Sequence, residues 1–531
     1  MRRIPRRQFL SVSAAAAAAL PVIGRARIEA AQNADRVFRH GVASGDPLHD
    51  RVVLWTRVSA SGDAVPVRWT IASDPKLARV VSRGEAQTGA ERDYTVKVDV
   101  NGLEPGTTYY YRFEAARGQS PIGRTRTLPA SGVARIRLGV VSCSNYPFGY
   151  FNAYAALANR PDLDAVLHLG DYIYEYQNGR FGDGSRIGRI PIPDAEILAL
   201  ADYRARHAQY KADPDSQAVH RQHPFLVVWD DHELANNAWS GGAENHNPDK
   251  GEGSWESRRR AAVRAYFEWM PIRETAASPG PRIYRTLRWG DLADLVLLDT
   301  RLIGRDQQAD RRDDIAMIES PSRSILGATQ EEWLGSELRE SRRAGTRWQV
   351  LGQQVMFAPQ SPPGRPTSNA DSWDGYRTSR NHVFDMIGAL KIENFAVLTG
   401  DVHSSWAFDL PRNPFDGYDP ASGRGSVGIE VAGTSVTSSS PIGSGPDGEK
   451  QLAAIKTARP HLHYVDGRYR GYYLVDITRE RFQAEFYAMK TVLDRTADER
   501  FATAFAAPAG QMHLTLQAAP APPPSAPDPA P

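Results

Sequence analysis

Four short apolar stretches of the 531-residue chain end in side chains that can bind metal ions. They are Arg137-Leu-Gly-Val-Val-Ser-Cys143, Asp164-Ala-Val-Leu-His-Leu-Gly-Asp171, Phe225-Leu-Val-Val-Trp-Asp-Asp-His-Glu233 and Phe395-Ala-Val-Leu-Thr-Gly-Asp-Val-His403. Each stretch has the length and the apolar content of a buried strand. Because ligands in α/β folds gather where such strands end, we expect a thiolate, carboxylates and an imidazole along one edge of a sheet.

These residue types suit the hydrolysis of phosphate esters. The uncatalysed reaction is very slow, and enzymes accelerate it with metal ions that neutralise the nonbridging oxygens and generate hydroxide from water. Two cations roughly 3.5–4 Å apart need a bridging carboxylate, for which Asp171 is the best candidate. Tyr174 follows three residues later, within reach of the same cation. An inert cysteine, packed tyrosines and a helix-capping aspartate are the structural alternatives, but they leave Asp231, Asp401 and His403 as separate coincidences.

Three motifs in a fixed order carry a resemblance to a known family. Gly170-Asp-Tyr-Ile-Tyr174, Asp230-Asp-His-Glu233 and Gly400-Asp-Val-His403 resemble the signature of calcineurin-like metallophosphoesterases. More closely, the chain looks like the PhoD type of exported alkaline phosphatase and phosphodiesterase. The resemblance extends over most of the chain, including Phe38-Arg-His-Gly-Val-Ala-Ser-Gly-Asp-Pro47 and Leu298-Asp-Thr-Arg301.

The resemblance implies two different cations. A ferric ion, Fe(3+), would be held by Cys143, Asp171, Tyr174 and His403, with calcium, Ca(2+), beside it. Purple acid phosphatases, which are more distant relatives, carry an asparagine where Asp231 stands and a histidine where Asp401 stands. Carboxylates at both positions make the second site all-oxygen and hard, which favours calcium over zinc. A thiolate and a phenolate donate strongly to Fe(III) and oppose its reduction.

Two cationic side chains are candidates for catalysis. By analogy with the matching family histidine, His232 would stabilise the transition state or protonate the leaving oxygen. The alternative is a histidine that only orients a metal ligand. Arg301 could fork two donors onto a phosphate, and a pairing of Arg301 with Asp299 or another buried acid is an equal alternative.

Three further polar residues have open roles at the second cation. Asp230 is either an acceptor behind the ligands or a ligand of an additional calcium. Gln354 lies where distant relatives carry a histidine ligand, so one calcium ligand stays unassigned. Asn237 is the second residue of a long polar loop, residues 236–251, and either ligates calcium or caps that loop, the latter being favoured.

The N-terminus predicts export. Met1-Arg-Arg-Ile-Pro-Arg-Arg-Gln-Phe-Leu-Ser11 precedes an alanine-rich stretch, as in a twin-arginine signal peptide, which we assign to residues 1–31. Its apolar part is too short to span a bilayer stably, so we expect a periplasmic or secreted protein without a permanent membrane span, recognised by the twin-arginine export machinery. Removing residues 1–31 takes away six Arg and one Glu, which lowers the formal net charge from +2 to −3. This balance does not indicate a nucleic-acid-binding surface.

The order of elements predicts two domains and a tail. Residues 36–128 contain β-type runs separated by turn residues, which favours a small all-β, fibronectin-like sandwich. Residues 135–515 alternate strands with helical stretches, which indicates an α/β domain, and the resemblance makes it a layered αββα metallophosphoesterase sandwich. Residues 517–531 are rich in proline, and we expect them to be a disordered tail.

The leading functional hypothesis is an exported hydrolase that cleaves phosphomonoesters, phosphodiesters or both without a covalent enzyme intermediate. A phospholipase D-like or teichoic-acid-directed phosphodiesterase on the same scaffold is the closest enzymatic alternative. A catalytically silent extracellular binding protein and a mononuclear iron redox protein are the alternatives from other classes. Every matched ligand position holds a competent donor, which disfavours the silent protein, and the oxygen-rich second site disfavours the redox protein.

Overall fold

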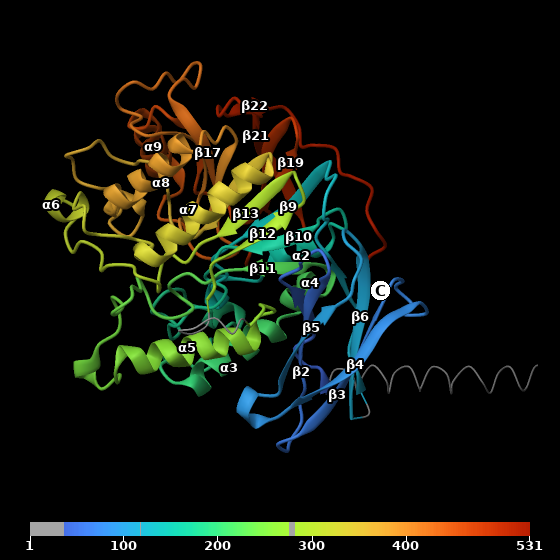
Figure 1. The fold of residues 1–531 in the computed structure, drawn as a ribbon. Helices are drawn as coiled ribbons and strands as arrows, with labels where there is room; N and C mark the ends of the chain where they lie inside the picture. Colours follow the sequence, from blue (N-terminus) through green and yellow to red (C-terminus); the bar gives the residue numbers. More distant parts are fainter. Residues whose placement is uncertain (1–36, 117, 275–281) are drawn as a thin grey trace, which may run out of the picture.

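The computed structural model describes residues 37–116, 118–274 and 282–531. Two large sheets face each other, with helices packed on their outer faces, and a five-stranded sheet stands beside them (Figure 1). The predicted signal peptide, residues 1–31, lies outside the described residues. Within the described part of the chain, no helix combines the length and the apolar character needed to cross a bilayer.

The first large sheet has ten strands. Their spatial order is β22 (Thr515–Gln517), β21 (Glu499–Pro508), β20 (Arg481–Met489), β19 (Gly471–Thr478), β9 (Arg135–Val141), β10 (Ala165–His168), β11 (Pro224–Val227), β1 (Val42–Gly45), β2 (Arg51–Arg57) and β5 (Thr95–Asn101). β9, β10 and β11 are parallel neighbours, so their carboxyl ends meet at one edge. These are three of the four strands predicted to deliver metal ligands.

The second large sheet has seven strands and contributes the fourth ligand-bearing strand. The order is β12 (Arg285–Trp289), β13 (Ala293–Leu297), β14 (Trp348–Gln353), β15 (Phe395–Thr399), β17 (Ser426–Ala432), β16 (Ser405–Pro411) and β18 (Leu462–Asp466). β13, β14, β15 and β17 are parallel. Successive side chains of a strand point to opposite faces, so Val350 packs towards the first sheet and Leu351 towards the helices.

Helices cover both outer faces. The helices beside the first sheet are α2 (Asn152–Ala158), α3 (Leu200–Ala212), α4 (Pro214–Gln222) and α5 (Trp255–Trp269), and those around the second are α6 (Ile315–Ile318), α7 (Gly327–Ala344), α8 (Arg377–Ala389) and α9 (Gly445–Thr457). Buried side chains of α7 and α8, such as Leu334 and Phe384, share a core with the outer face of the second sheet. The predicted αββα layering is confirmed.

The N-terminal sandwich is joined to the main fold by hydrogen bonds. One layer is the five-stranded sheet of β4 (Val80–Thr88), β3 (Val65–Ala72), β6 (Thr108–Ala115), β7 (Gly118–Gln119) and β8 (Gly123–Arg126). The other layer is β1, β2 and β5, and β1 pairs in parallel with β11. β2 is buried on both faces, with Leu54 inside the sandwich and Trp55 against Trp269 of α5. The sandwich therefore shares its inner sheet with the α/β layers.

The C-terminal tail differs from its prediction. Residues 518–531 form no helix or strand, yet they run along the body towards the N-terminal sandwich (Figure 1). The Ala521 N–H donates to the Glu485 carboxylate at 2.7 Å, and the Ala530 N–H donates to Gln222 Oε1 at 2.9 Å. An extended proline-rich backbone leaves its polar groups unpaired within the segment, so they are free to bond to the body. The prediction of a disordered tail is wrong for this structure.

Candidate metal centre

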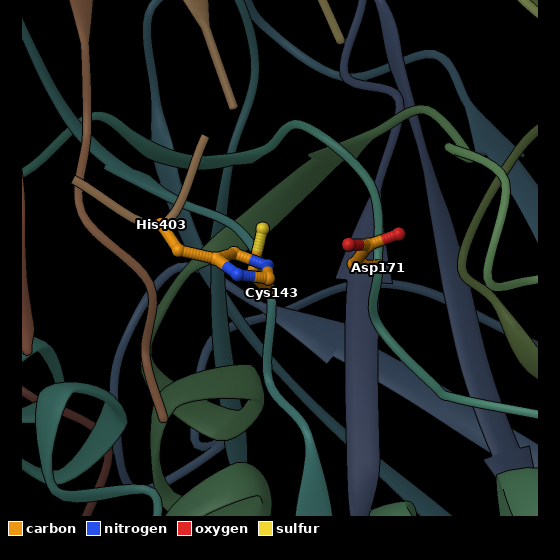
Figure 2. A group of neighbouring side chains, drawn as sticks. All are labelled: Cys143, Asp171 and His403. Atoms are coloured by element: carbon orange, nitrogen blue, oxygen red, sulfur yellow. The ribbon is translucent and has the colours of Figure 1, made fainter. Parts of the chain in front are cut away.

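The loops that leave β9, β10 and β15 bring three predicted metal ligands together. Cys143, Asp171 and His403 each offer a ligand atom, and these three atoms lie within 4.8 Å of one another. Figure 2 shows the three side chains directed towards one region between the strand ends. Cys143 and Asp171 are buried. The convergence of strand ends thus gathers the thiol, the carboxylate and the imidazole as the sequence predicted.

The backbone at this edge is bent sharply. Cys143, Asp171, Asp401 and His403 have φ values of 63°, 57°, 60° and 51°. This left-handed region is sparsely populated by residues other than glycine and costs on the order of 1–3 kcal/mol per residue. Strain repeated at four neighbouring ligand candidates is typical of a functional site, because the surrounding fold must hold each of them in place.

Tyr174 joins the same group. Its hydroxyl donates to Asp171 Oδ2 at 2.9 Å and lies 3.3 Å from His403 Nε2. Ser438 donates to the Tyr174 oxygen at 2.8 Å. Burial raises the pKa of both the Cys143 thiol and the Tyr174 phenol well above their usual values. A bound cation acts in the opposite direction and deprotonates such ligands, so this donor set fits a strongly acidic metal ion.

A second, all-oxygen group lies beside the first. Asp230, Asp231 and Asp401 offer ligand atoms within 4.8 Å of one another, while Asp171 groups with Asp231 and His232 under the same limit. Asp230 Oδ2 and Asp231 Oδ1 are buried without a hydrogen-bond partner. Buried carboxylate oxygens without partners are costly unless a cation compensates them, so the residues fit a hard cation here. Asp171 is common to both halves of the centre.

The electrostatics separate the carboxylates. Burial raises the pKa of Asp401 to about 7, although Arg301 acts against that rise. Burial also acts to raise the pKa of Asp231, but Arg301 and His232 outweigh it and hold that pKa below the usual value. Asp231 is thus the carboxylate that stays ionised most readily before any cation binds.

His232 is held by an acid that the sequence analysis did not single out. Its Nδ1 lies 2.7 Å from Glu175 Oε2, and its ring stacks on Tyr174 with centroids 4.2 Å apart. Burial acts to lower the pKa of His232, but the charges of Asp231, Glu175 and Asp171 outweigh it and raise that pKa well above 6.5. His232 is therefore a cationic donor at the edge of the carboxylate cluster. The sequence signal for Glu175 was its position directly after Tyr174.

Two of the three guanidinium nitrogens of Arg301 form hydrogen bonds with acidic side chains. Nε donates to Asp230, and Nη1 lies 2.9 Å from both carboxylate oxygens of Asp371. Nη2 forms no hydrogen bond and lies 3.6 Å from Asp231 Oδ1 and 3.9 Å from Asp401 Oδ1. The pairing alternative is therefore the observed one, although not with Asp299, which instead accepts the backbone N–H groups of Arg301 and Leu302. The predicted two-donor fork onto phosphate is not available in this arrangement.

Gln354 braces the loops. Its amide nitrogen donates to the carbonyls of Trp229 and Leu298 at 2.8 and 2.9 Å, and its oxygen accepts from Thr300 Oγ1 at 2.6 Å. An amide with these partners has little capacity left for a cation. The ligand that the sequence left unassigned is therefore not supplied by Gln354 in this arrangement, where Gln354 holds β11 and β13 together through the segments that follow them.

Asn237 also connects a loop to the carboxylate cluster. Its backbone N–H donates to Asp231 Oδ2 at 2.6 Å, and its side chain donates to Glu244 within the same polar loop. Its φ of 51° is also left-handed, which asparagine tolerates better than most residues. These contacts match the loop-bracing alternative.

The fold and the paired clusters define a metallophosphoesterase-like hydrolase, and the comparisons with known proteins identify the family. Residues 138–486 match the PhoD-like phosphatase family, and residues 24–129 match the N-terminal domain of PhoD-like phosphatases. The chain belongs to the PhoD-like phosphatases and is a phosphoester hydrolase.

Individual relatives agree with this assignment. The chain is 38% identical over 492 residues to alkaline phosphatase D of Bacillus subtilis (strain 168), covering 89% of this chain and 81% of that protein. The solved structure of PhoD is 36% identical, covers 92% of this chain and 93% of its own, and has a TM-score of 0.81. The purple acid phosphatase PPD1 from yellow lupin seeds shares the fold, at 14% identity and a TM-score of 0.54 over 88% of this chain and 73% of its own.

Proposed function

We propose that this phosphatase is exported by the twin-arginine route and cleaves phosphomonoesters, phosphodiesters or both at an iron–calcium centre. One observation carries the proposal: Asp171 belongs both to the group with Cys143 and His403 and to the group with Asp231 and His232. A carboxylate shared in this way can bridge two cations. When bound, such cations neutralise the nonbridging phosphate oxygens and make hydroxide available at neutral pH.

The donor types support different cations in the two halves. Cys143, Tyr174, Asp171 and His403 supply a thiolate, a phenolate, a carboxylate and an imidazole, a set suited to ferric iron. Asp231 and Asp401 supply only oxygen, which suits calcium. Asp230 stands behind them, because its Oδ1 already accepts from Arg301 while its Oδ2 remains unpaired.

We assign acid catalysis to His232. The imidazolium has one N–H directed at Glu175, so its other nitrogen is the one that can donate to a leaving oxygen. Glu175 is a positioning residue, since it fixes the ring and keeps it protonated. For Arg301 we take the acid-paired alternative: its Nη2 faces Asp231 and Asp401, and its positive charge offsets the charges of those carboxylates.

The experiment that tests the proposal is turnover of a chromogenic phosphomonoester and a chromogenic phosphodiester by the mature protein with calcium, compared with Asp401→Asn. We expect calcium-dependent hydrolysis by the wild type and its loss in the variant, and the ratio of the two rates identifies the preferred ester class. Calcium-independent hydrolysis that survives Asp401→Asn contradicts the assignment. Circular dichroism and thermal unfolding establish that the two proteins are equally folded.

Export has its own test. Replacing Arg6 and Arg7 with lysine should retain the protein inside the cell, because the paired arginines are the recognised feature of the signal. The amount of mature protein in the periplasm or medium is the measurement. Unchanged export of the double-lysine variant contradicts the twin-arginine assignment and leaves the hydrolase assignment untouched.

A further inference from the structure

A second group of metal-binding side chains lies apart from the centre described above. Asp409 on β16, His463 on β18 and His513, in the segment between β21 and β22, offer ligand atoms within 4.8 Å of one another. Asp409 is buried and the two histidines are partly exposed. None of the three belongs to the motifs that define the phosphoesterase centre.

The carboxylate of Asp409 is held between the two imidazoles. Its Oδ2 lies 2.7 Å from His513 Nδ1, and its Oδ1 lies 3.0 Å from His463 Nε2. His463 Nε2 is nevertheless buried without a hydrogen bond, because the geometry of that approach is unsuitable for one. His463 Nε2 therefore has no hydrogen bond to give up when it binds an ion together with Asp409.

The surroundings orient this carboxylate as outer partners do in metal sites. Tyr418 donates to Asp409 Oδ2 at 2.8 Å, and the Leu514 N–H donates to Oδ1 at 2.9 Å. Such outer hydrogen bonds fix metal-binding carboxylates and are a regular part of metal sites. Gly423 sits so close that a Cβ there would lie 2.4 Å from the His513 Cβ, which lets the turn that contains it close over the histidine.

We propose that Asp409, His463 and His513 bind one divalent transition-metal ion of the zinc class. Two imidazoles and a carboxylate are a common ligand set for zinc, with water as the fourth ligand. Neighbouring ligands of tetrahedral zinc lie about 3.3 Å apart, given zinc–ligand distances of about 2.0–2.1 Å. The present spacings of 2.7 and 3.0 Å thus need to open by only a few tenths of an ångström. Two nitrogen donors disfavour calcium.

The position assigns the ion a structural role. β16 and β18 lie at one edge of the seven-stranded sheet, whereas His513 lies next to β22, the edge strand of the ten-stranded sheet. A metal bound to all three side chains therefore fastens the edges of the two sheets to each other. Because the ion binds only the folded chain, it stabilises the native state by an amount that grows with the logarithm of its concentration once that exceeds the dissociation constant.

Crystals of the wild-type protein soaked in zinc chloride test the proposal directly. Diffraction data collected on either side of the zinc absorption edge should show an anomalous difference peak bonded to Asp409, His463 and His513. Absence of a peak there, in crystals whose active centre or solvent shows zinc, overturns the proposal. In that case the three residues form only a hydrogen-bonded ion pair.

Variants extend the test to solution. Zinc bound per chain, measured by elemental analysis after gel filtration, should fall by one equivalent in His463→Gln and in His513→Gln. The zinc-induced rise in unfolding temperature should be smaller in these variants than in the wild type. His382→Gln is the matched control, since His382 also pairs with an acid, Glu331 Oε2 at 3.2 Å, but lies on α8 and belongs to neither cluster. Equal zinc content in all four proteins overturns the proposal.

Discussion

The phosphoesterase centre and the Asp409–His463–His513 cluster use similar side chains in opposite backbone settings. At the centre, Cys143, Asp171, Asp401 and His403 all have left-handed φ values, whereas none of the three residues of the second cluster is among the left-handed residues of the described chain. The centre also leaves the buried oxygens Asp230 Oδ2 and Asp231 Oδ1 unpaired, whereas both oxygens of Asp409 are bonded.

The difference in backbone strain and in unpaired oxygens follows from the different requirements of catalysis and of stability. A reactive centre needs metal-binding atoms that are held rigidly and are not already used in hydrogen bonds. The fold holds these atoms in place through strained turns at the ends of parallel strands. A structural tie only needs ligands in relaxed backbone at the sheet edges, here two on strands and one in the segment between β21 and β22. The same ligand types therefore predict loss of turnover in one region and loss of stability in the other.

The largest effect is expected from Asp171→Asn, which removes the carboxylate common to both halves of the centre. Since loss of an outer partner of a metal ligand alone costs about 10–100-fold, we expect kcat/KM to fall by more than about 100-fold. Phosphoester hydrolysis measured alongside metal content checks the prediction. Activity within tenfold of wild type with two metals still bound would remove Asp171 from the bridging role.

Next comes Glu175→Gln. The Glu175 charge helps to raise the pKa of His232, so its removal lowers that pKa and the protonated form is lost at a lower pH. We expect kcat to fall by about 10–100-fold and its alkaline limb to move to lower pH. The pH profile of kcat separates this from a merely structural role, which would lower kcat without moving the limb.

A pH dependence of stability that does not involve a metal ion is expected from His223, which lies between the N-terminal sandwich and the main fold. Burial lowers the pKa of His223 to about 3; its Nδ1 accepts from Arg124 at 3.3 Å and its Nε2 donates to the Leu157 carbonyl at 3.0 Å. The unfolded chain binds the proton first, so the free energy of unfolding falls as pH drops from 6.5 towards 3. The loss between pH 6.5 and pH 5 is about 2 kcal/mol for this group.

His223→Gln should flatten that dependence. Denaturant unfolding in the presence of a chelator makes the comparison free of acid-induced metal release, which would otherwise affect both clusters. An identical pH dependence in wild type and variant would show that His223 is already charged in the folded protein or does not contribute.

The smallest effect is expected on turnover in His513→Gln. The second cluster contributes no residue to the centre, and distant sites act independently, so kcat/KM should stay within about twofold of wild type at a temperature where both proteins are folded. Initial rates with the two chromogenic esters measure it. A large loss of turnover in the fully folded variant would show that the phosphoesterase centre depends on the second cluster.

The sequence predicted the parts of the centre that follow strands directly. Cys143, Asp171 and His403 could be placed together because parallel strands bring their carboxyl ends to one edge. Glu175 and Ser438 could not be assigned, since their contacts with His232 and Tyr174 depend on how the loops fold back. Arg301 was found as a site residue, but its acid partner Asp371 lies in a loop whose path no local pattern specifies.

The fold was predictable to a similar degree. Alternating strands and helices indicated the layers, while the parallel pairing of β1 with β11 joins segments about 180 residues apart and has no local signal. The second cluster escaped prediction for the same reason, because Asp409, His463 and His513 come from three separate elements. The docked tail depends on acceptors that only the folded body presents.

Visible absorption of the purified mature protein, followed together with turnover, is the most direct test of the proposed centre. If Cys143 and Tyr174 bind ferric iron, the protein is coloured by charge transfer from thiolate and phenolate to the metal. The band should then change in Tyr174→Phe and disappear in step with activity when iron is removed. A colourless, iron-free protein with full activity would contradict the ferric centre.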